Sequence, residues 1–407
     1  MTANTVESFL ANLQRSRLLA AEDFKSAADL ASSAHYDPQV LARLLTRRSL
    51  ITSWQAQQLL AGRHSFFLGP YRLLERVGQG RFGIVFRSQH ETKRNIVALK
   101  VLPAEAMSNP HVAARFEREV RLASKLKHPH IVNAYAAQEV HGIHFLIMEY
   151  VPGRTLRQWI QEFGRLPIDW SCEVVRQCAL GLDYAAAQGI VHRDIKPSNI
   201  MVEAQSTSGR PHAKLLDLGV ARAMDENEEA RLTKPGHVLG TVDYMAPEQV
   251  QNTPGVDTRA DIYSLGCTLF HAITGQVPFS GDNWAERMLV RTRSEAPLLS
   301  TLRHDLPVGL SELVAQLLAR NPAHRISTAS AVAAALEPFS RTTDLSPQPY
   351  VLTARLDLAA PSDDRVAVLE RQLSELTARL AQLERLLESS LDLQLLPLPS
   401  NMSKKAS

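Results

Sequence analysis

The chain has 407 residues, which is long enough for one large domain and one or two smaller parts. Its formal net charge of +3 is small for that length and gives no reason to expect a nucleic-acid partner. Three cysteines form neither a paired framework nor a CxxC motif, so we expect a cytoplasmic location. The first ten residues lack a basic run before an apolar core, and no run of about 18 apolar residues follows, which argues against a signal peptide and a membrane span.

Residues 1–64 are predicted to be helical. Asp37 and Pro38 are typical of a helix start, because proline has no N–H to lose at the first helical position. Thr52 and Gln55 have the spacing of a capping box. Two interpretations remain open: a module that docks on a partner or on the following domain, or a helical prefix whose apolar faces pack on each other.

The pattern changes at Tyr71 to short β-rich runs that are separated by Gly-rich or polar turns. A helix is predicted for residues 112–127, and two further strand-like runs follow it. After Gly153 the sequence is mostly helical to about residue 339. Strands first and helices later predict an α+β domain with two unlike lobes over residues 71–339.

The last part of the chain is predicted to hold a linker, a coiled-coil helix and a tail, at residues 340–364, 365–390 and 391–407. The linker is rich in Pro, Ser, Thr and Asp. The helix carries an apolar heptad stripe, made of Val366, Leu369, Leu373, Leu376, Leu380, Leu383 and Leu387. Such a stripe predicts a homodimer through this helix, and packing of the helix on the preceding domain is the alternative.

A glycine-rich motif, GQGRFGIV, occupies residues 78–85 between two predicted strands. Gly78, Gly80 and Gly83 let the backbone approach phosphate oxygens closely, with its N–H groups facing the anion. Dinucleotide-binding loops use similar glycines but continue as a helix, whereas Val85 here belongs to a strand. The motif alone leaves two interpretations open, a phosphate-binding loop and a plain glycine hairpin.

Lys100 ends an apolar strand in the motif VALK. A single lysine after a strand is usually a solvated end, so its interpretation depends on a carboxylate partner. We expect Glu119 to be that partner because its interval to the following His-Pro pair fits, and Glu117 is the alternative. A Lys–Glu pair would hold the ammonium group against the α- and β-phosphates of a nucleotide.

The motif HRDIKPSN at residues 192–199 carries the strongest chemical signal. It places Asp194, Lys196 and Asn199 in one tight loop, and these supply a group that orients a hydroxyl, a cation for the γ-phosphate and an oxygen ligand for Mg²⁺. Asp217 follows a strand in the motif DLG and is a second Mg²⁺ ligand candidate. The segment GTVDYMAPEQ follows at residues 240–249.

In this order and spacing, the motifs of residues 71–339 resemble a Hanks-type protein kinase domain, in the style of bacterial Ser/Thr kinases. The resemblance implies transfer of the γ-phosphoryl group of ATP, with Mg²⁺, to protein Ser/Thr hydroxyls, including autophosphorylation in signalling. It implies a catalytic set made of Asp194, Lys196, Lys100 and Glu119, with Asn199 and Asp217 as metal ligands. It also implies an ATP site lined by Val77, Gly78, Gly80, Gly83, Val85, Ala98, Lys100, Met148, Glu149, Val151 and Met201.

The same resemblance implies two structural supports. Asp261 matches a buried aspartate that holds the catalytic loop, and Glu248 and Arg325 match an ion pair at the end of the activation segment. Two positions depart from the family pattern. Leu218 replaces the usual Phe of the metal-binding motif, and Ser198 stands where many members have Glu; neither removes a metal ligand.

Regulation by phosphorylation is predicted at the activation segment. We expect Thr233 to be the phosphosite, with Arg193 and Arg222 as charged partners of the phosphate group. Thr241 is an alternative phosphosite, although its position resembles a structural threonine that hydrogen-bonds the catalytic loop.

Two other classes of protein are alternatives to an active protein kinase. A pseudokinase scaffold is disfavoured because Lys100, Asp194, Asn199 and Asp217 are all present. A small-molecule kinase of related fold is disfavoured by the complete GTVDYMAPE segment, which resembles a platform for an extended polypeptide.

Overall fold

The computed structural model describes residues 5–33, 37–80, 83–107, 109–203, 210–217, 242–251 and 255–340. The chain divides into two compact units, Met1–Pro349 and Tyr350–Ser407, and all described residues belong to the first. The predicted linker, coiled coil and tail lie outside the described residues, so these predictions stay untested. Across the described ranges, no helix combines the length and the apolar character that a bilayer span requires.

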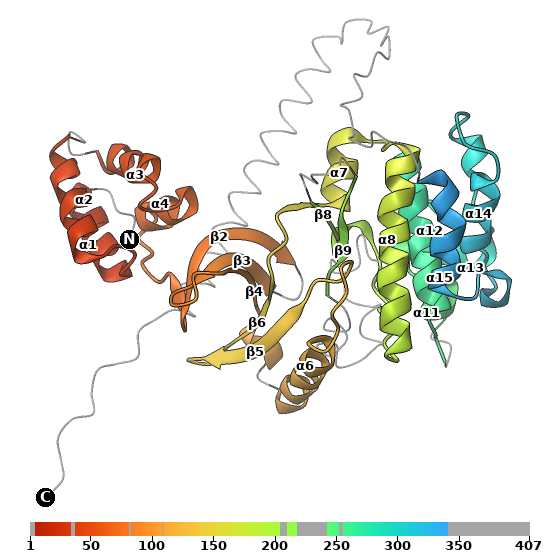
Figure 1. Cartoon of the computed structure of the whole chain (residues 1–407), viewed down its shortest axis with the longest axis horizontal. Helices are drawn as coiled ribbons and strands as arrows, with labels where there is room; N and C mark the ends of the chain where they lie inside the picture. Colours follow the sequence, from red (N-terminus) through yellow and green to blue (C-terminus); the bar gives the residue numbers. More distant parts are fainter. Residues whose placement is uncertain are drawn as a thin grey trace, which may run out of the picture. The chain divides into compact units, whose positions relative to one another are not determined.

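Four helices form the N-terminal part, and we call them the N-terminal helical domain (Figure 1). Their bounds are α1 (Val6–Ser16), α2 (Ala21–Ser33), α3 (Pro38–Arg47) and α4 (Ser53–Leu60). Both predicted helix starts are present: the Asp37 carboxylate accepts from Gln39 N at 2.8 Å, and Thr52 and Gln55 form a complete capping box. The helices share an apolar core that includes Phe9, Leu13, Leu41, Leu45, Leu59 and Phe66.

The next part, which we call the N-terminal lobe, is built on an antiparallel six-stranded sheet. The strand order is β1-β2-β3-β4-β6-β5. Its strands are β1 (Phe67–Leu68), β2 (Tyr71–Gly80), β3 (Gly83–His90), β4 (Ile96–Val101), β5 (Ala134–Val140) and β6 (Ile143–Glu149). Alternate residues of β4 face opposite sides, so Ala98 packs in one apolar cluster while Val97 and Leu99 pack in another. The first cluster contains Phe116 of α6, which fixes that helix against the sheet.

Helices α5 (Ala104–Met107) and α6 (Pro110–Ala123) lie between β4 and β5 in the sequence. The sequence predicted one helix at residues 112–127, and the observed α6 begins and ends earlier. It begins at Pro110 because the Asn109 side chain accepts from His111 N at 2.9 Å and caps the first turn.

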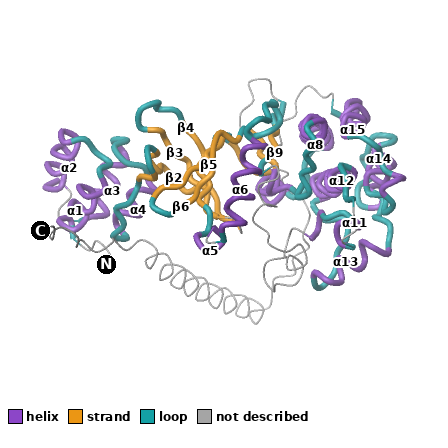
Figure 2. The backbone as a smooth tube through the Cα atoms, turned by 90° about the horizontal axis from the view of Figure 1, so that it is seen from below, coloured by secondary structure: helices purple, strands orange, loops and turns teal. Residues whose placement is uncertain are grey.

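The C-terminal lobe is mainly helical, as the sequence predicted, and Figure 2 separates its helices from the strands of the N-terminal lobe. Its larger elements are α7 (Leu156–Phe163), α8 (Ile168–Ala187), α11 (Pro247–Val250), α12 (Arg259–Thr274), α13 (Trp284–Arg293), α14 (Leu310–Leu317) and α15 (Ala329–Leu336). A small sheet joins β7 (Gly153–Thr155), β8 (Ile200–Glu203) and β9 (Ala213–Leu215). Short 3₁₀ turns are η1 (Pro197–Asn199), η2 (Val242–Tyr244), η3 (Leu299–Thr301), η4 (Pro322–His324) and η5 (Glu337–Phe339).

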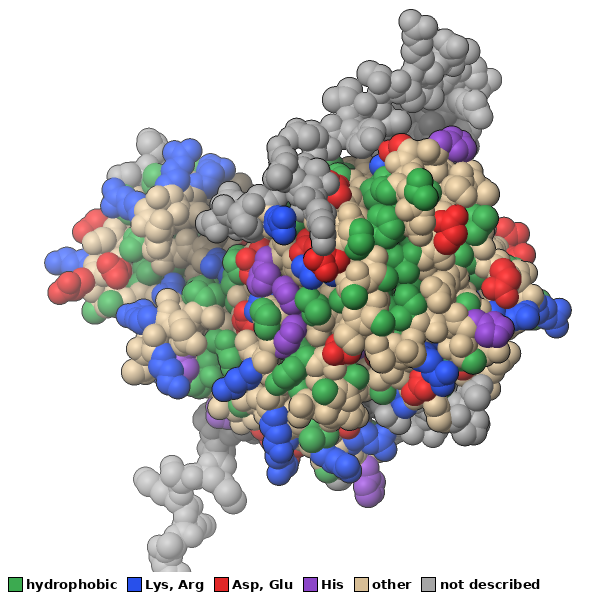
Figure 3. All heavy atoms as spheres, turned by 45° about the vertical axis from the view of Figure 1, so that its right-hand side comes forward, with side chains coloured by type: hydrophobic (Ala, Val, Ile, Leu, Met, Phe, Trp, Pro, Cys, Tyr) green, Lys and Arg blue, Asp and Glu red, His purple; other side chains and the backbone are tan. Residues whose placement is uncertain are grey.

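Helices α8 and α12 form the centre of this lobe and are apolar on most of their surface, as expected for helices inside a core. On the face shown in Figure 3, the described part of the surface mixes acidic and basic side chains in small groups.

The predicted Glu248–Arg325 ion pair is confirmed and joins α11 to the end of the lobe. Arg325 Nη1 and Nη2 lie 2.6 and 2.8 Å from the two carboxylate oxygens of Glu248, and the Arg325 side chain is fully buried. The guanidinium also donates to the carbonyls of Ala319, Arg320 and Arg259. It lies over the Tyr263 ring at 4.8 Å. Together these contacts of Arg325 fix α11 in place.

Glu248→Gln is expected to lower the free energy of unfolding by about 3–5 kcal/mol, because it leaves the buried Arg325 charge uncompensated. The matched control is Asp257→Asn, whose partner Arg259 is at 2.8 Å but is exposed, with an expected loss below about 1 kcal/mol. Urea unfolding of the two variants and the wild type measures the difference. Equal losses in the two variants would contradict the structural role of the pair.

Candidate active site

The Gly-rich motif forms the hairpin of β2 and β3, which we call the Gly-rich hairpin, with Gly80 opposite Gly83. Gly83 has a φ of +123°, and a Cβ at this position would collide with the carbonyl oxygen of Val101 on β4. Only glycine fits there, so the backbone of Gly83 lies directly against the strand that carries Lys100. Val85 is the register partner of Lys100. The sequence left a phosphate loop and a plain hairpin open, and this placement beside Lys100 favours the former.

The predicted adenine-contacting residues come together only in part. Val85, Ala98 and Met148 pack in one cluster, and Ala98 and Met148 are register partners on β4 and β6. Val151 is buried just after β6, and Met201 is half-buried on β8 of the other lobe. Outside this cluster, Val77 is 43% exposed on β2, and Gly78 lies beside it.

Glu149 begins the connection between the lobes and is held by two residues that the sequence analysis missed. Lys214 Nζ on β9 lies 2.6 Å from the Glu149 carboxylate. The Asn133 backbone N and side-chain Nδ2 donate to the same carboxylate at 3.1 and 2.8 Å. Glu149 and Lys214 are 65 positions apart in the sequence, so no local pattern predicts this pair. These bonds fix the backbone from which an adenine edge would be read.

Lys100 pairs with Asp217 in this structure. Its Nζ lies 2.7 Å from Asp217 Oδ2, and its side chain is only 7% exposed. Glu119, the partner that the sequence predicted, is half-buried on α6. The described partner of the buried ammonium group is a carboxylate from the other lobe. The Lys100–Glu119 pair stays a prediction.

Asp217 has a lowered pKa and an unusual backbone conformation. Burial raises the pKa of its carboxyl group, but Lys100, with smaller contributions from His192 and Lys196, lowers it, and the pKa is lowered overall. The carboxylate is thus charged at neutral pH. Its φ of +57° is in the left-handed region, which costs free energy for a residue with a side chain.

The loop of residues 192–199 brings Asp194, Lys196 and Asn199 together as predicted. Lys196 Nζ lies 2.9 Å from each Asp194 carboxylate oxygen. Asn199 Nδ2 donates to Asp194 O at 2.8 Å and to Asp194 Oδ2 at 3.0 Å. The Asp194 carboxylate is 12% exposed, so it is fixed by two partners and still reachable.

A buried aspartate supports this loop, which confirms the structural role expected for Asp261. Its two carboxylate oxygens accept from His192 N at 2.8 Å and from Arg193 N at 2.7 Å. These bonds hold Arg193 at a φ of +63°. Burial raises the pKa of Asp261 despite these donors. His192, which the sequence analysis did not single out, extends the support: its Nε2 is 2.9 Å from the carbonyl of Leu216, next to Asp217.

The donor set fits a divalent cation held jointly with a phosphate chain. Asn199 uses its Nδ2 on Asp194, which leaves Oδ1 as a ligand, and Asp217 uses only Oδ2 on Lys100. Carboxylate and amide oxygens are the ligands that Mg²⁺ prefers. Among the described residues no group of three or more His, Cys, Asp and Glu side chains forms a complete metal cage.

Three residues of the predicted regulatory set lie outside the described residues: Arg222, Thr233 and Thr241. Leu218 of the predicted metal-binding motif also lies outside them. Arg193 is described, and its Nη2 donates to the carbonyl of Val256 at 3.2 Å. Its own carbonyl accepts from Gln249 Nε2 at 3.1 Å. The assignment of Thr233 as phosphosite is therefore still a prediction.

Comparisons with known proteins agree with this geometry. The protein kinase domain family model matches residues 71–336. Serine/threonine-protein kinase PknD of Mycobacterium tuberculosis is 36% identical over 300 residues, which cover 72% of this chain and 44% of PknD. PknE of Mycobacterium bovis is 35% identical over 276 residues, covering 68% of this chain and 47% of PknE. This chain thus spans less than half the length of these relatives.

The chain is also similar to a solved structure of a kinase domain. The crystal structure of the PknI kinase domain of Mycobacterium tuberculosis has a TM-score of 0.53 and 28% identity. The match covers 67% of this chain and 97% of that domain. The chain therefore belongs to the protein kinase family, within its Hanks-type bacterial Ser/Thr group.

Proposed function

We propose that the chain is an active protein Ser/Thr kinase that transfers the γ-phosphoryl group of ATP to protein hydroxyls. Two contact sets carry the proposal: Asp194 with Lys196 and Asn199, and Asp217 with Lys100 from the other lobe. The bond from Leu216 N to the carbonyl of Asn199, 2.9 Å long, joins the two segments. The named activity of the Ser/Thr kinase relatives supports the same conclusion. A scaffold that had lost catalysis would not need to keep all five groups.

Each group has a role that its position allows. Asp194 is placed to orient the attacking hydroxyl and to accept its proton, as general bases in such loops do. Lys196, now 2.9 Å from that carboxylate, supplies a positive charge where negative charge develops on the transferred group. Lys100 is placed to hold the α- and β-phosphates once it exchanges Asp217 for the nucleotide.

The metal is proposed to be Mg²⁺, with Asn199 Oδ1 and Asp217 as the protein ligands. Bound there, the ion would neutralise charge on the β- and γ-phosphates. The chain's own contribution is to hold both oxygens in place before the nucleotide arrives. The Asn199–Asp194 bonds hold the amide, and the His192–Leu216 bond holds the backbone next to Asp217.

Asp194→Asn is expected to lower kcat about a hundredfold to ten-thousandfold, because the amide cannot accept the hydroxyl proton. ATP affinity should change little, since Asp194 does not hold the nucleotide. Transfer from labelled ATP to a generic basic protein measures kcat, and the exposed Asp282→Asn is the matched control. Near wild-type turnover of Asp194→Asn would overturn the assignment.

Asp217→Ala is expected to remove the Mg²⁺-dependent part of ATP binding. Wild-type protein should bind a fluorescent ATP analogue more tightly with Mg²⁺ than with EDTA, whereas the variant should bind equally in both. Lys100→Met is the control, because it breaks the same ion pair but keeps the metal ligand. It should weaken binding in both buffers and retain the Mg²⁺ effect; a retained effect in Asp217→Ala would contradict the metal assignment.

Self-association through residues 365–390 is proposed as the way in which two kinase domains meet for autophosphorylation at Thr233. Support comes from the sequence alone: Val366, Leu373 and Leu380 share one seam position of the heptad. Each buried leucine contributes about 1.5–3 kcal/mol, so a few heptads offset the entropy of pairing. A cytoplasmic location and Ser/Thr protein substrates belong to the same proposal.

The variant L373E/L380E is expected to be monomeric at micromolar concentration, because charge enters the seam. Light scattering should find the wild-type chain and the outer-face variant Arg371→Glu as dimers. A chain that ends near residue 340 should match the seam variant. A monomeric wild-type chain would show that the helix does not pair.

A further inference from the structure

The N-terminal helical domain contacts the N-terminal lobe at a small number of specific points. Gln55 is completely buried, and its Nε2 donates to the carbonyl of Leu73 on β2 at 2.7 Å. Thr52 Oγ1 donates to the carbonyl of the next residue, Leu74, at 2.6 Å. The bond from Arg72 Nη2 to the carbonyl of Leu50 is longer, at 3.4 Å. The start of α4 is thus fastened to the start of β2.

These bonds give hydrogen-bond partners to backbone carbonyls at the outer edge of β2. The pairing of β2 with β3 shifts register between Leu73 and Glu75. On the outer edge of β2, β1 pairs only as far as Arg72, and Leu73 N donates to the carbonyl of Phe66 just before β1. The carbonyls of Leu73 and Leu74 accept from the side chains of Gln55 and Thr52 rather than from a further strand.

An aromatic contact reaches the second strand of the hairpin. The Trp54 ring lies 5.6 Å from the Phe86 ring on β3, and 5.8 Å from the Phe66 ring in the core of the helical domain. Phe86 follows Val85 directly, and the two side chains face opposite sides of the sheet. Val85 packs in the cluster of the proposed adenine site, so Trp54 supports the hairpin from behind that site.

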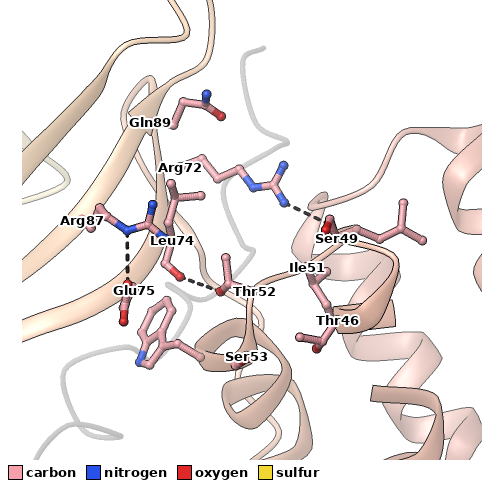
Figure 4. A pocket seen from close by; sticks show the side chains of 12 residues that line it. Thr46, Ser49, Ile51, Thr52, Ser53, Arg72, Leu74, Glu75, Arg87 and Gln89 are labelled. Atoms are coloured by element: carbon pink, nitrogen blue, oxygen red, sulfur yellow. Dashed lines mark hydrogen bonds and ion pairs between the residues drawn. The ribbon is translucent and has the colours of Figure 1, made fainter. Parts of the chain in front are cut away.

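The junction is only partly packed, which makes these contacts individually important. A cavity of about 480 Å³ opens beside them, lined from one side by residues 49–54 and from the other by Arg72, Leu74, Glu75 and Arg87 (Figure 4). In Figure 4 the bond from Thr52 to Leu74 crosses between the two walls. Thr52 and Trp54 thus lie at the edge of a space that side chains do not fill.

We propose that the N-terminal helical domain positions the Gly-rich hairpin for ATP, with Trp54 and Gln55 as its positioning residues. Gln55 fixes β2 seven residues before Gly80, and Trp54 fixes β3 three residues after Gly83. Both ends of the loop are therefore attached to one rigid group of helices. The proposal rests on the proposed role of this hairpin in ATP binding.

Gln55→Ala and Trp54→Ala are expected to raise KM for ATP about three- to tenfold, the range for losing one contact that maintains a binding-competent arrangement. At saturating ATP the nucleotide itself holds the hairpin, so kcat should stay within about twofold of wild type. Steady-state kinetics of the full chain at varied ATP measure both constants. A retained kcat also shows that each variant is folded.

Two controls separate positioning from general stability. Gln57→Ala changes an exposed glutamine on the same helix and should leave KM unchanged. Trp54→Phe keeps an aromatic ring against Phe86 and should restore KM to within about twofold of wild type.

The result that overturns the proposal is an unchanged KM for ATP in both alanine variants, or a fall in kcat without a change in KM. Either variant suffices if the other does not fold. Lys100→Met identifies a different failure: if it keeps wild-type activity, the proposed ATP site itself is wrong. If Lys100→Met is inactive and the alanine variants keep their KM, only the positioning role fails.

Discussion

The carboxylate of Asp261 is the constraint on which the active-site geometry depends. It accepts from two consecutive backbone N–H groups, and so it holds Arg193 in a left-handed conformation that the residue would otherwise avoid. The turn that results directs Asp194 toward Lys196 and Asn199. Through His192 and the carbonyl of Leu216, the same support reaches Asp217. One buried side chain thus sets both the proposed base and the proposed metal ligand.

The two lobes meet through charge pairs that the sequence could not predict. Asp194, Lys196 and Asn199 lie within six residues, so their spacing alone predicted that they would meet. The contact of Lys100 with Asp217 was not predicted: the sequence indicated Glu119 from its interval to the His-Pro pair, whereas Asp217 lies 117 positions away along the chain. Which carboxylate compensates a buried ammonium depends on the arrangement of the lobes, and local sequence patterns do not contain that information.

For the N-terminal helices, local sequence patterns also predicted only part of the structure. Their caps at Asp37 and Thr52 could be predicted from the sequence because a cap depends on three or four neighbouring residues. The sequence left open whether the helices dock on the next domain or pack on each other, and in the structure they do both. Gln55 shows why: one amide group caps its own helix and bonds β2. Only the tertiary structure reveals the second bond.

The central claim is that this site transfers phosphoryl groups to protein hydroxyls. The most direct measurement incubates the purified full chain with γ-labelled ATP, Mg²⁺ and a generic basic protein, followed by analysis of the labelled amino acids. The account predicts label on phosphoserine or phosphothreonine, and none when EDTA replaces Mg²⁺. Label found only as free phosphate or on small molecules, or no transfer at all, would contradict it.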